Sequence, residues 1–260
     1  MSVLVFGSLH WDVIVRAPRL PALDETLIGE AATYRFGGKG GNQALAAAHS
    51  GARVVMAGAV GEDEAAGRLL AELDAAGIDR TAVARVPGPS GMSVAIDTGG
   101  DYGAVVVSGA NLKVMAPVPS SDTGVVLIQN EVPEAANLAL ARALPDDATL
   151  ILNAAPARRV APDLMARVDI LVVNRVEAAQ MGAAAFGDHV TIVTRGADGL
   201  TLHRDGMETH VPARSVPVVS THGAGDAFCG ALAAALAEGV AFADALDAAQ
   251  SFAARHISRP

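Results

Sequence analysis

The segment Ser220-Thr221-His222-Gly223-Ala224-Gly225-Asp226-Ala227-Phe228 lies where a strand-like run gives way to a helix. Val216-Pro217-Val218-Val219 precedes it, and an alanine-rich pattern predicts a helix from about Asp226 to Glu238. The free N–H groups of a helix's first turn carry partial positive charge and bind anions. Because glycine lets the backbone come close to a ligand, the two glycines of this segment predict an anion site built from main chain.

Asp226 is the unusual residue of this segment, because it places a carboxylate where an anion is expected to bind. A negative side chain in the first turn also suits the helix dipole, and that explanation needs no ligand. The alternative is that Asp226 is a general base beside a phosphate site and removes a proton from the hydroxyl that attacks the phosphate. This segment alone leaves both explanations open.

The composition predicts one α/β domain with an aliphatic core, since 51% of the 260 residues are hydrophobic and 3% are aromatic. A net charge of −9 without a basic run argues against nucleic acid or an anionic membrane as a partner. Cys229 is the single cysteine, which excludes an internal disulfide and a cysteine-rich metal site. The sequence shows no targeting or membrane-spanning pattern, so we expect a cytoplasmic protein.

From residue 124 onward, strand and helix patterns alternate, which predicts a mostly parallel sheet covered by helices on both faces. The expected strands are Val125–Gln129, Leu150–Asn153, Ile170–Asn174, His189–Thr194 and Leu200–Arg204. The expected helices are Glu134–Leu144, Pro162–Arg167, Glu177–Met181, Asp226–Glu238 and Phe242–His256. Before residue 124 we expect strands at Val3–Phe6 and Arg53–Ala59 and helices at Gln43–Ser50 and Asp63–Ala76.

Two other segments alternate in hydropathy, as antiparallel strands outside the main sheet do. Residues 12–36 contain strand-like pieces at Val13–Arg16, Glu25–Glu30 and Ala32–Phe36. In residues 90–108, Ser90–Asp97 pairs with Tyr102–Ser108 across the turn Thr98-Gly99-Gly100-Asp101. We expect these pieces to form one small antiparallel sheet.

Gly37-Gly38-Lys39-Gly40-Gly41-Asn42 is too rich in glycine for a simple turn, because so many glycines cost chain entropy. That cost favours a ligand that approaches the backbone. The segment lacks the Gly-Lys-Ser/Thr of a phosphate-binding loop and the third glycine of the dinucleotide fingerprint. Lys39 and Asn42 can hydrogen-bond sugar hydroxyls.

Polar residues also end two later strands, at the positions where open α/β sheets bind ligands. Asn174-Arg175-Val176-Glu177 follows one of these strands. Glu177 is either an ordinary charge at the start of a helix or a partner of Mg²⁺. A plain turn adequately explains the segment from Thr194 to Gly199, which joins two strands.

Taken in order, these motifs resemble the ribokinase family of sugar kinases (PfkB-type carbohydrate kinases) over nearly the whole chain. Gly37 to Gln43 is similar to the family's amino-terminal signature, Gly223-Ala224-Gly225-Asp226 to its carboxyl-terminal signature, and Asn174-x-x-Glu177 to a third family motif. Residues 37–43 and 152–158 look most like ribokinases proper. The resemblance implies a ribokinase-like α/β fold, with one kinase domain over residues 1–260 and a small β lid from residues 12–36 and 90–108.

The same resemblance implies a role for each matching residue. Asp226 is the expected base, and the backbone of Gly223, Ala224 and Gly225 is the expected anion hole for the transferring phosphoryl group. The expected sugar contacts are Asp12, His10, Gly38, Lys39, Asn42 and Glu131. The nucleotide side comprises Asn174, Thr194 and Gly196, with Glu177 organising Mg²⁺ through water. In ribokinases the lid also pairs subunits, so a homodimer through the lid is expected from the resemblance.

Several positions depart from the family pattern. His10 replaces the asparagine expected two residues before Asp12, so the sugar can differ from ribose. Ser220 stands where many members have an aspartate that helps to hold a monovalent cation, and the sequence stops at Arg259-Pro260, before another loop that the family normally supplies. Both departures argue against activation by potassium. The segment between Glu177 and His189 lacks a helix that ribokinases usually have.

The leading hypothesis is an ATP- and Mg²⁺-dependent kinase that phosphorylates a primary hydroxyl of a furanose sugar, with D-ribose to ribose 5-phosphate as the expected reaction. A second hypothesis keeps the chemistry and changes the substrate to a nucleoside, pseudouridine, fructose or deoxyribose. His10 and Trp11 could then stack on a base. A third is a non-catalytic sugar-binding protein, although such a protein has no need of Asp226.

Overall fold

The computed structural model describes residues 1–99, 102–182 and 186–258. Nine strands of these residues form one sheet in the order β13-β12-β11-β10-β9-β8-β1-β4-β5. They are β1 (Ser2–Phe6), β4 (Val54–Val60), β5 (Asp79–Arg85), β8 (Thr123–Gln129), β9 (Thr149–Asn153), β10 (Ile170–Asn174), β11 (Val190–Thr194), β12 (Leu200–Arg204) and β13 (Met207–Val211). The pairs β11–β12 and β12–β13 are antiparallel and the others are parallel, so the predicted mostly parallel sheet is confirmed.

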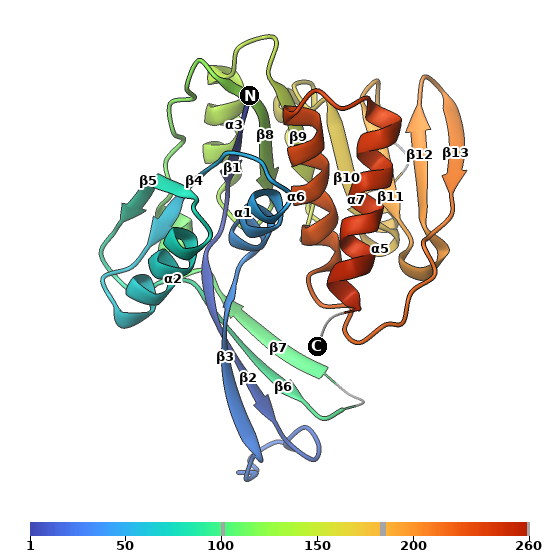
Figure 1. Ribbon diagram of the computed structural model, residues 1–260. Helices are drawn as coiled ribbons and strands as arrows, with labels where there is room; N and C mark the ends of the chain where they lie inside the picture. Colours follow the sequence, from blue (N-terminus) through green and yellow to red (C-terminus); the bar gives the residue numbers. More distant parts are fainter. Residues whose placement is uncertain (100–101, 183–185, 259–260) are drawn as a thin grey trace.

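Helices cover both faces of this sheet. Successive residues of a strand point to opposite sides, and the central strands carry apolar residues on both sides, so both faces must be buried. On β1, Val3 and Val5 join the core under α1 (Lys39–His49), α2 (Glu64–Ala75), α6 (Ala224–Ala237) and α7 (Phe242–Ile257). Leu4 and Phe6 join the core under α3 (Glu134–Ala143), α4 (Pro162–Met165) and α5 (Arg175–Met181). Figure 1 shows α6 and α7 side by side over the first of these faces.

The strand order reverses between β1 and β8. From β1 the chain adds β4 and β5 on one side, whereas β8 to β13 are added on the other. In open α/β sheets such a reversal leaves a crevice at the carboxyl ends of the strands, and ligands bind there. The topology therefore points to the residues just after β1 and β8, namely Gly7 to Leu9 and Asn130 to Val132.

Four strands of the described residues form the second sheet, in the order β3-β2-β6-β7, which projects from one end of the main sheet (Figure 1). They are β2 (His10–Arg16), β3 (Ala31–Gly37), β6 (Met92–Asp97) and β7 (Tyr102–Val107). The small sheet is confirmed, but its central pair β2–β6 is parallel, and only the two outer pairs are antiparallel. The turn residues Gly100 and Asp101, like Arg259 and Pro260, lie outside the described residues.

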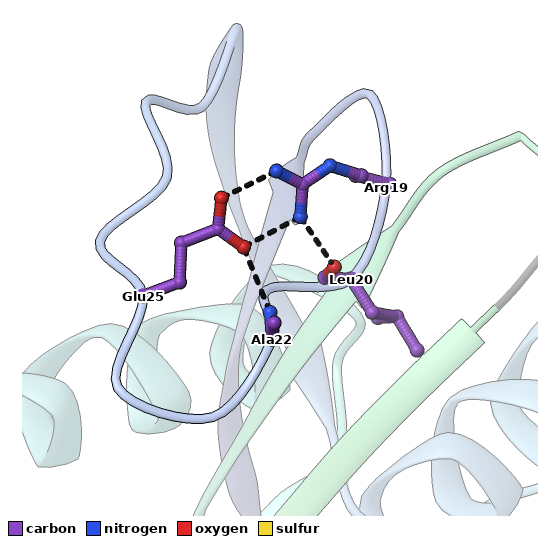
Figure 2. A network of polar contacts seen from close by, with 4 residues as sticks. All are labelled: Arg19, Leu20, Ala22 and Glu25. Atoms are coloured by element: carbon purple, nitrogen blue, oxygen red, sulfur yellow. Dashed lines mark hydrogen bonds and ion pairs between the residues drawn. The ribbon is translucent and has the colours of Figure 1, made fainter.

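The prediction of a strand at Glu25–Glu30 is wrong, because this stretch is a loop that side-chain hydrogen bonds hold in place (Figure 2). Arg19 Nη1 donates to Glu25 Oε2 at 2.6 Å, and the second guanidinium nitrogen pairs with Oε1. The Ala22 N–H also donates to Glu25 Oε2, at 2.8 Å. Glu25 therefore folds back on residues 19–22 and the stretch does not pair as a strand. The Arg19 side chain and then the Ala22 N–H lower the pKa of Glu25 to about 2.

The other expected elements are confirmed to within two residues, except that α1 begins at Lys39 and not at Gln43, and β2 begins at His10 and not at Val13. Gly40 and Gly41 thus lie inside the helix. A Cβ on Gly40 would be 2.7 Å from the backbone carbon of Gly7, and one on Gly41 would be 2.6 Å from the Phe36 ring. The chain's own packing therefore requires these two glycines. β5 and β13 were not predicted, because both are exposed edge strands without a continuous apolar run.

Among the described residues, no helix combines the length and the apolar character that a membrane crossing needs.

Helices α1 and α6 cross closely at Gly230. A Cβ there would be 2.4 Å from the Gln43 carbonyl oxygen and 2.6 Å from Ala46 Cβ. We therefore expect Gly230→Ala to lower the free energy of unfolding by about 1–3 kcal/mol through overpacking, measured by urea denaturation. Gly67→Ala on α2 is the matched control, because open space surrounds that position and the change should add about 0.5–1 kcal/mol. Equal stability of the two variants would contradict the close crossing.

Candidate active site

A hydrogen bond joins the two segments that flank the crevice at the strand reversal. Ser8, which follows β1, donates its hydroxyl to Oε2 of Glu131, which follows β8. The same carboxylate oxygen accepts the Lys39 N–H at 2.9 Å. Glu131 therefore joins both strand ends to the start of α1.

The amino end of α1 is satisfied by protein groups. Besides the Lys39 N–H, the Gly40 N–H donates to Ser8 Oγ at 3.4 Å and the Gly41 N–H to the Ser8 carbonyl at 2.9 Å. Gly38 precedes this turn with a φ of 83°, and a Cβ on it would be 2.8 Å from the Ser8 carbonyl. The first turn of α1 is therefore occupied and offers little to an anion.

The amino end of α6 is open. Gly223 stands before the helix in the left-handed region, with φ 73°, and it has no capping side chain. Within the described ranges, the N–H groups of Gly223, Gly225 and Asp226 have no protein acceptor. Gly225 is exposed and Ala224 is half-buried. The Ala224 N–H donates to the Thr221 carbonyl at 3.3 Å. Unsatisfied N–H groups at a helix start can bind an anion, so the first turn of α6 offers such groups and that of α1 does not.

Asp226 lies in the same turn but points into the protein, with 8% of its surface exposed. Gln43 Nε2 donates to its Oδ1 at 2.9 Å, and Asn42 Nδ2 lies 3.4 Å from its Oδ2. Gln43 also donates to Asn153 Oδ1 at 3.0 Å and accepts from Gln129 Nε2 at 2.6 Å. Because Gln129 and Asn153 end neighbouring strands, this chain of amides fixes the carboxylate relative to the sheet.

Burial is the main cause that raises the pKa of Asp226 above its ordinary value, and the negative charge of Glu131 adds to it. Lys39 and the hydrogen bond from Gln43 act in the opposite direction. Burial alone would lower the pKa of Lys39, but attraction to Asp226, Glu131 and Glu177 raises it, so the ammonium group stays charged. A buried carboxylate with a raised pKa is a better proton acceptor than an ordinary aspartate.

On the small sheet, Asp12 accepts the Ser93 N–H at 3.2 Å, and its carboxylate lies against Gly37, just before α1. His10 begins the same strand and is 3% exposed. Its ring packs against Gly91, and its Nε2 is a buried nitrogen without a hydrogen-bond partner among the described residues. A buried imidazole nitrogen of this kind is satisfied by a water or a ligand.

On the other side of the site, Asn174 and Thr194 are directly paired at the carboxyl ends of β10 and β11. Asn174 Oδ1 accepts the N–H groups of Val176 and Glu177 at 2.8 and 2.9 Å, and Glu177 Oε2 accepts the Asn174 N–H at 2.7 Å. The motif is therefore a capping box, as expected if Glu177 is an ordinary charge at the start of a helix. Glu177 still acts electrostatically on Lys39. Gly196, with φ 60°, lies in the short turn after Thr194.

The carboxylates fit a magnesium ion shared with phosphates better than a metal held by protein alone. No cluster of three or more His, Cys, Asp and Glu side chains in the described part of the chain could hold a metal. Asp226, Glu131 and Glu177 nevertheless all act on Lys39, so negative charge exceeds positive charge locally. Mg²⁺ prefers oxygen ligands and usually binds through one or two carboxylates, water and substrate phosphates.

Sequence reasoning gave no role to Ser8, Gln43, Gln129, Asn153 or Asn111. Ser8 binds Glu131, and the amides of Gln43, Gln129 and Asn153 hold Asp226 in place. Asn111 is fully buried and holds Leu9, just before His10, by hydrogen bonds to its N–H and carbonyl at 2.9 and 3.0 Å. The available signal was a polar residue at the end of a buried strand, as with Gln129 and Asn153. Cys229, one turn after Gly225, is inert, because burial raises the pKa of its thiol.

Comparison with known proteins gives the family of the chain. The sequence model of the family described as "pfkB family carbohydrate kinase" matches residues 1–260. The chain is 33% identical to the ribokinase of Bacillus subtilis, covering 99% of this chain and 92% of that protein. It is 32% identical to the deoxyribokinase of Salmonella typhi, covering 90% and 85%. The solved structure of Arabidopsis thaliana ribokinase complexed with ribose and ATP has a TM-score of 0.88 at 27% identity, covering 99% and 93%.

Since the carboxylate of Asp226 is penalised by burial, we expect Asp226→Asn to raise the thermal unfolding temperature of the ligand-free protein at pH 7. Because folding raises the pKa of this carboxyl group, the folded protein loses stability as the pH rises from the group's unfolded pKa towards its folded pKa. The rise in unfolding temperature caused by Asp226→Asn should therefore shrink as the pH falls towards 4. Differential scanning calorimetry at several pH values measures it. Asp247→Asn, at an exposed pair with Arg214, is the control and should show no such gain. A fall in unfolding temperature for Asp226→Asn at pH 7 would contradict this account.

Proposed function

The chain belongs to the pfkB family of carbohydrate kinases and is a sugar kinase that uses ATP, and on that premise we propose that it transfers the γ-phosphoryl group of ATP to the primary hydroxyl of D-ribose. The ribokinases of two organisms support this substrate, since both match the chain over most of its length. A second candidate substrate is deoxyribose, because the Salmonella typhi deoxyribokinase is about as similar.

The observation that supports this proposal best is the position of Asp226 beside the open first turn of α6. The backbone of Gly223, Ala224 and Gly225 provides the anion hole for the migrating phosphoryl group, and the Ala224 N–H would have to exchange its 3.3 Å bond to the Thr221 carbonyl for the phosphoryl oxygen. Asp226 accepts the proton from the attacking hydroxyl, and its raised pKa suits that step. Phosphoryl transfer depends mainly on positioning and on stabilising negative charge, which this pairing supplies.

The sugar would lie between the small sheet and the start of α1. Its contacts are Asp12, His10, Gly38, Lys39, Asn42 and Glu131. The buried Nε2 of His10 has no hydrogen-bond partner in the described part of the chain. This supports a hydrogen bond to the sugar, since an unsatisfied buried nitrogen is unfavourable. Asn42 would contact both the sugar and Asp226, which lie on the same side of α1.

The nucleotide would lie along the carboxyl ends of β10 and β11, against Asn174, Thr194 and Gly196. Glu177 would hold Mg²⁺ through water, since its carboxylate already caps α5. When bound, Mg²⁺ neutralises charge that develops on the phosphates. Lys39 would remain protonated and would attract the anionic substrate towards Asp226.

The small sheet would act as a lid over the sugar and as a dimer surface. In one row across it, Tyr34, Val13, Val94 and Val105 are directly opposite one another and therefore share a face. Tyr34 is 61% and Val105 68% exposed. Trp11 lies on the same face, whereas Asp12 lies on the other. An apolar row on the face away from the sugar supports a homodimer.

A panel of sugars and nucleosides, with MgATP consumption as the readout, tests the proposed reaction. We expect ribose to give the highest kcat/KM, with deoxyribose and nucleosides lower. Asp226→Asn should lose about 10²–10⁴-fold in turnover because it lacks the base, while calorimetry still detects ribose binding. Asp247→Asn should match the natural protein.

A higher kcat/KM with deoxyribose or a nucleoside would replace ribose as the substrate. Sugar binding without consumption of ATP for any member of the panel would instead identify a non-catalytic sugar-binding protein. A loss below about 10-fold in Asp226→Asn would remove the base assigned here.

The dimer is tested by light scattering coupled to size-exclusion chromatography. Val105→Glu places a charge in the apolar row and should give a monomer. Met207→Glu on β13 is the control, because Met207 is as exposed (67%) but lies on the far edge of the main sheet, and it should remain a dimer. A monomeric natural protein, or a dimer for Val105→Glu, would contradict the lid interface.

A further inference from the structure

The last turn of α7 lies against the segment that leads into the anion hole. The Ile257 carbonyl accepts the Val219 N–H at 2.8 Å and the Ser220 N–H at 3.2 Å. His256 Nε2 lies 3.0 Å from the carbonyl oxygen of His222, the residue just before Gly223. Three hydrogen bonds thus tie the end of α7 to residues 219–222.

The contact with His222 has only one possible polarity. A carbonyl oxygen can only accept, so His256 must carry its proton on Nε2 and donate it. The same ring lies against Gly223, where a Cβ would be 3.2 Å from Nε2. Gly223 therefore has two reasons to be glycine, namely its left-handed φ of 73° and the imidazole beside it.

The orientation of the His222 carbonyl determines where the next N–H points. In a trans peptide the C=O and the following N–H point in opposite directions from one plane. A hydrogen bond that holds the His222 oxygen towards α7 therefore directs the Gly223 N–H away from α7. That N–H has no protein acceptor among the described residues.

We propose that His256 is a positioning residue for the anion hole: its Nε2–H holds the His222 carbonyl and thereby aims the Gly223 N–H at the transferring phosphoryl group. This inference rests on the proposed kinase reaction. Donors that are fixed before the reaction stabilise developing charge without a cost of reorganisation, which is why holding one peptide plane affects turnover. His256 and His222 are both exposed, so water competes for the bond and the effect is smaller than the loss of a donor.

The test compares kcat and KM of His256→Ala, His256→Gln and His49→Ala with those of the natural protein, for the sugar that the panel identifies and for MgATP. His256→Ala should lower kcat roughly 10-fold and leave the KM for the sugar unchanged, because the sugar contacts lie elsewhere. In glutamine the side-chain nitrogen is as many bonds from Cα as Nε2 is in histidine. His256→Gln should therefore restore kcat to within about 2-fold. His49→Ala removes an exposed histidine from the last turn of α1 and should have no effect.

Hydrogen exchange of residues 219–226 in the ligand-free variants gives a second readout, with faster exchange expected for His256→Ala alone. Natural turnover in His256→Ala, or failure of the glutamine to restore kcat, would overturn the inference and leave the proposed function intact. Absence of turnover in the natural protein with every sugar and nucleoside would overturn the proposed function, and the inference with it.

Discussion

The contact between the amino ends of α1 and α6 is the constraint on which the rest of the site depends. Gln43 on α1 donates to the buried carboxylate of Asp226 on α6, and Lys39 supplies the nearby positive charge. Burying a carboxylate is unfavourable unless hydrogen bonds and an opposite charge compensate for it. In the proposed reaction, this burial places the carboxylate beside N–H groups of its own helix that have no acceptor among the described residues, where it would receive the proton.

The two helix starts show how the fold assigns different roles to similar sequences. Both follow glycine-rich segments, yet the first turn of α1 is filled by Ser8 and Glu131. At the start of α6, the N–H groups of Gly223, Gly225 and Asp226 have no acceptor among the described residues. The difference follows from the sheet. α1 packs onto the crevice between β1 and β8, so strand-end residues reach its amides, while α6 begins after a long exposed segment. The open start is the one that a phosphoryl group can occupy.

Much of this arrangement could be predicted from sequence, because it depends on residues that are close together in the chain. The strand and helix patterns after residue 124 and the motif at Gly223 to Asp226 are short-range signals, and the structure follows them. The amide chain through Gln43, Gln129 and Asn153 is long-range, so no periodicity reveals it. The glycines of α1 predicted a ligand but are needed for packing against Gly7 and Phe36. The segment that contains Glu25 alternates in hydropathy like a strand, but Glu25 pairs with Arg19 and the segment forms a loop.

A crystal structure with Mg²⁺, ADP, aluminium fluoride and the preferred sugar tests the central claim most directly. The account predicts the fluoride at the N–H groups of residues 223–225, with a carboxylate oxygen of Asp226 about 2.6–3.2 Å from the sugar's primary hydroxyl. A carboxylate turned away from that hydroxyl, or a phosphoryl analogue bound anywhere other than the first turn of α6, would contradict it.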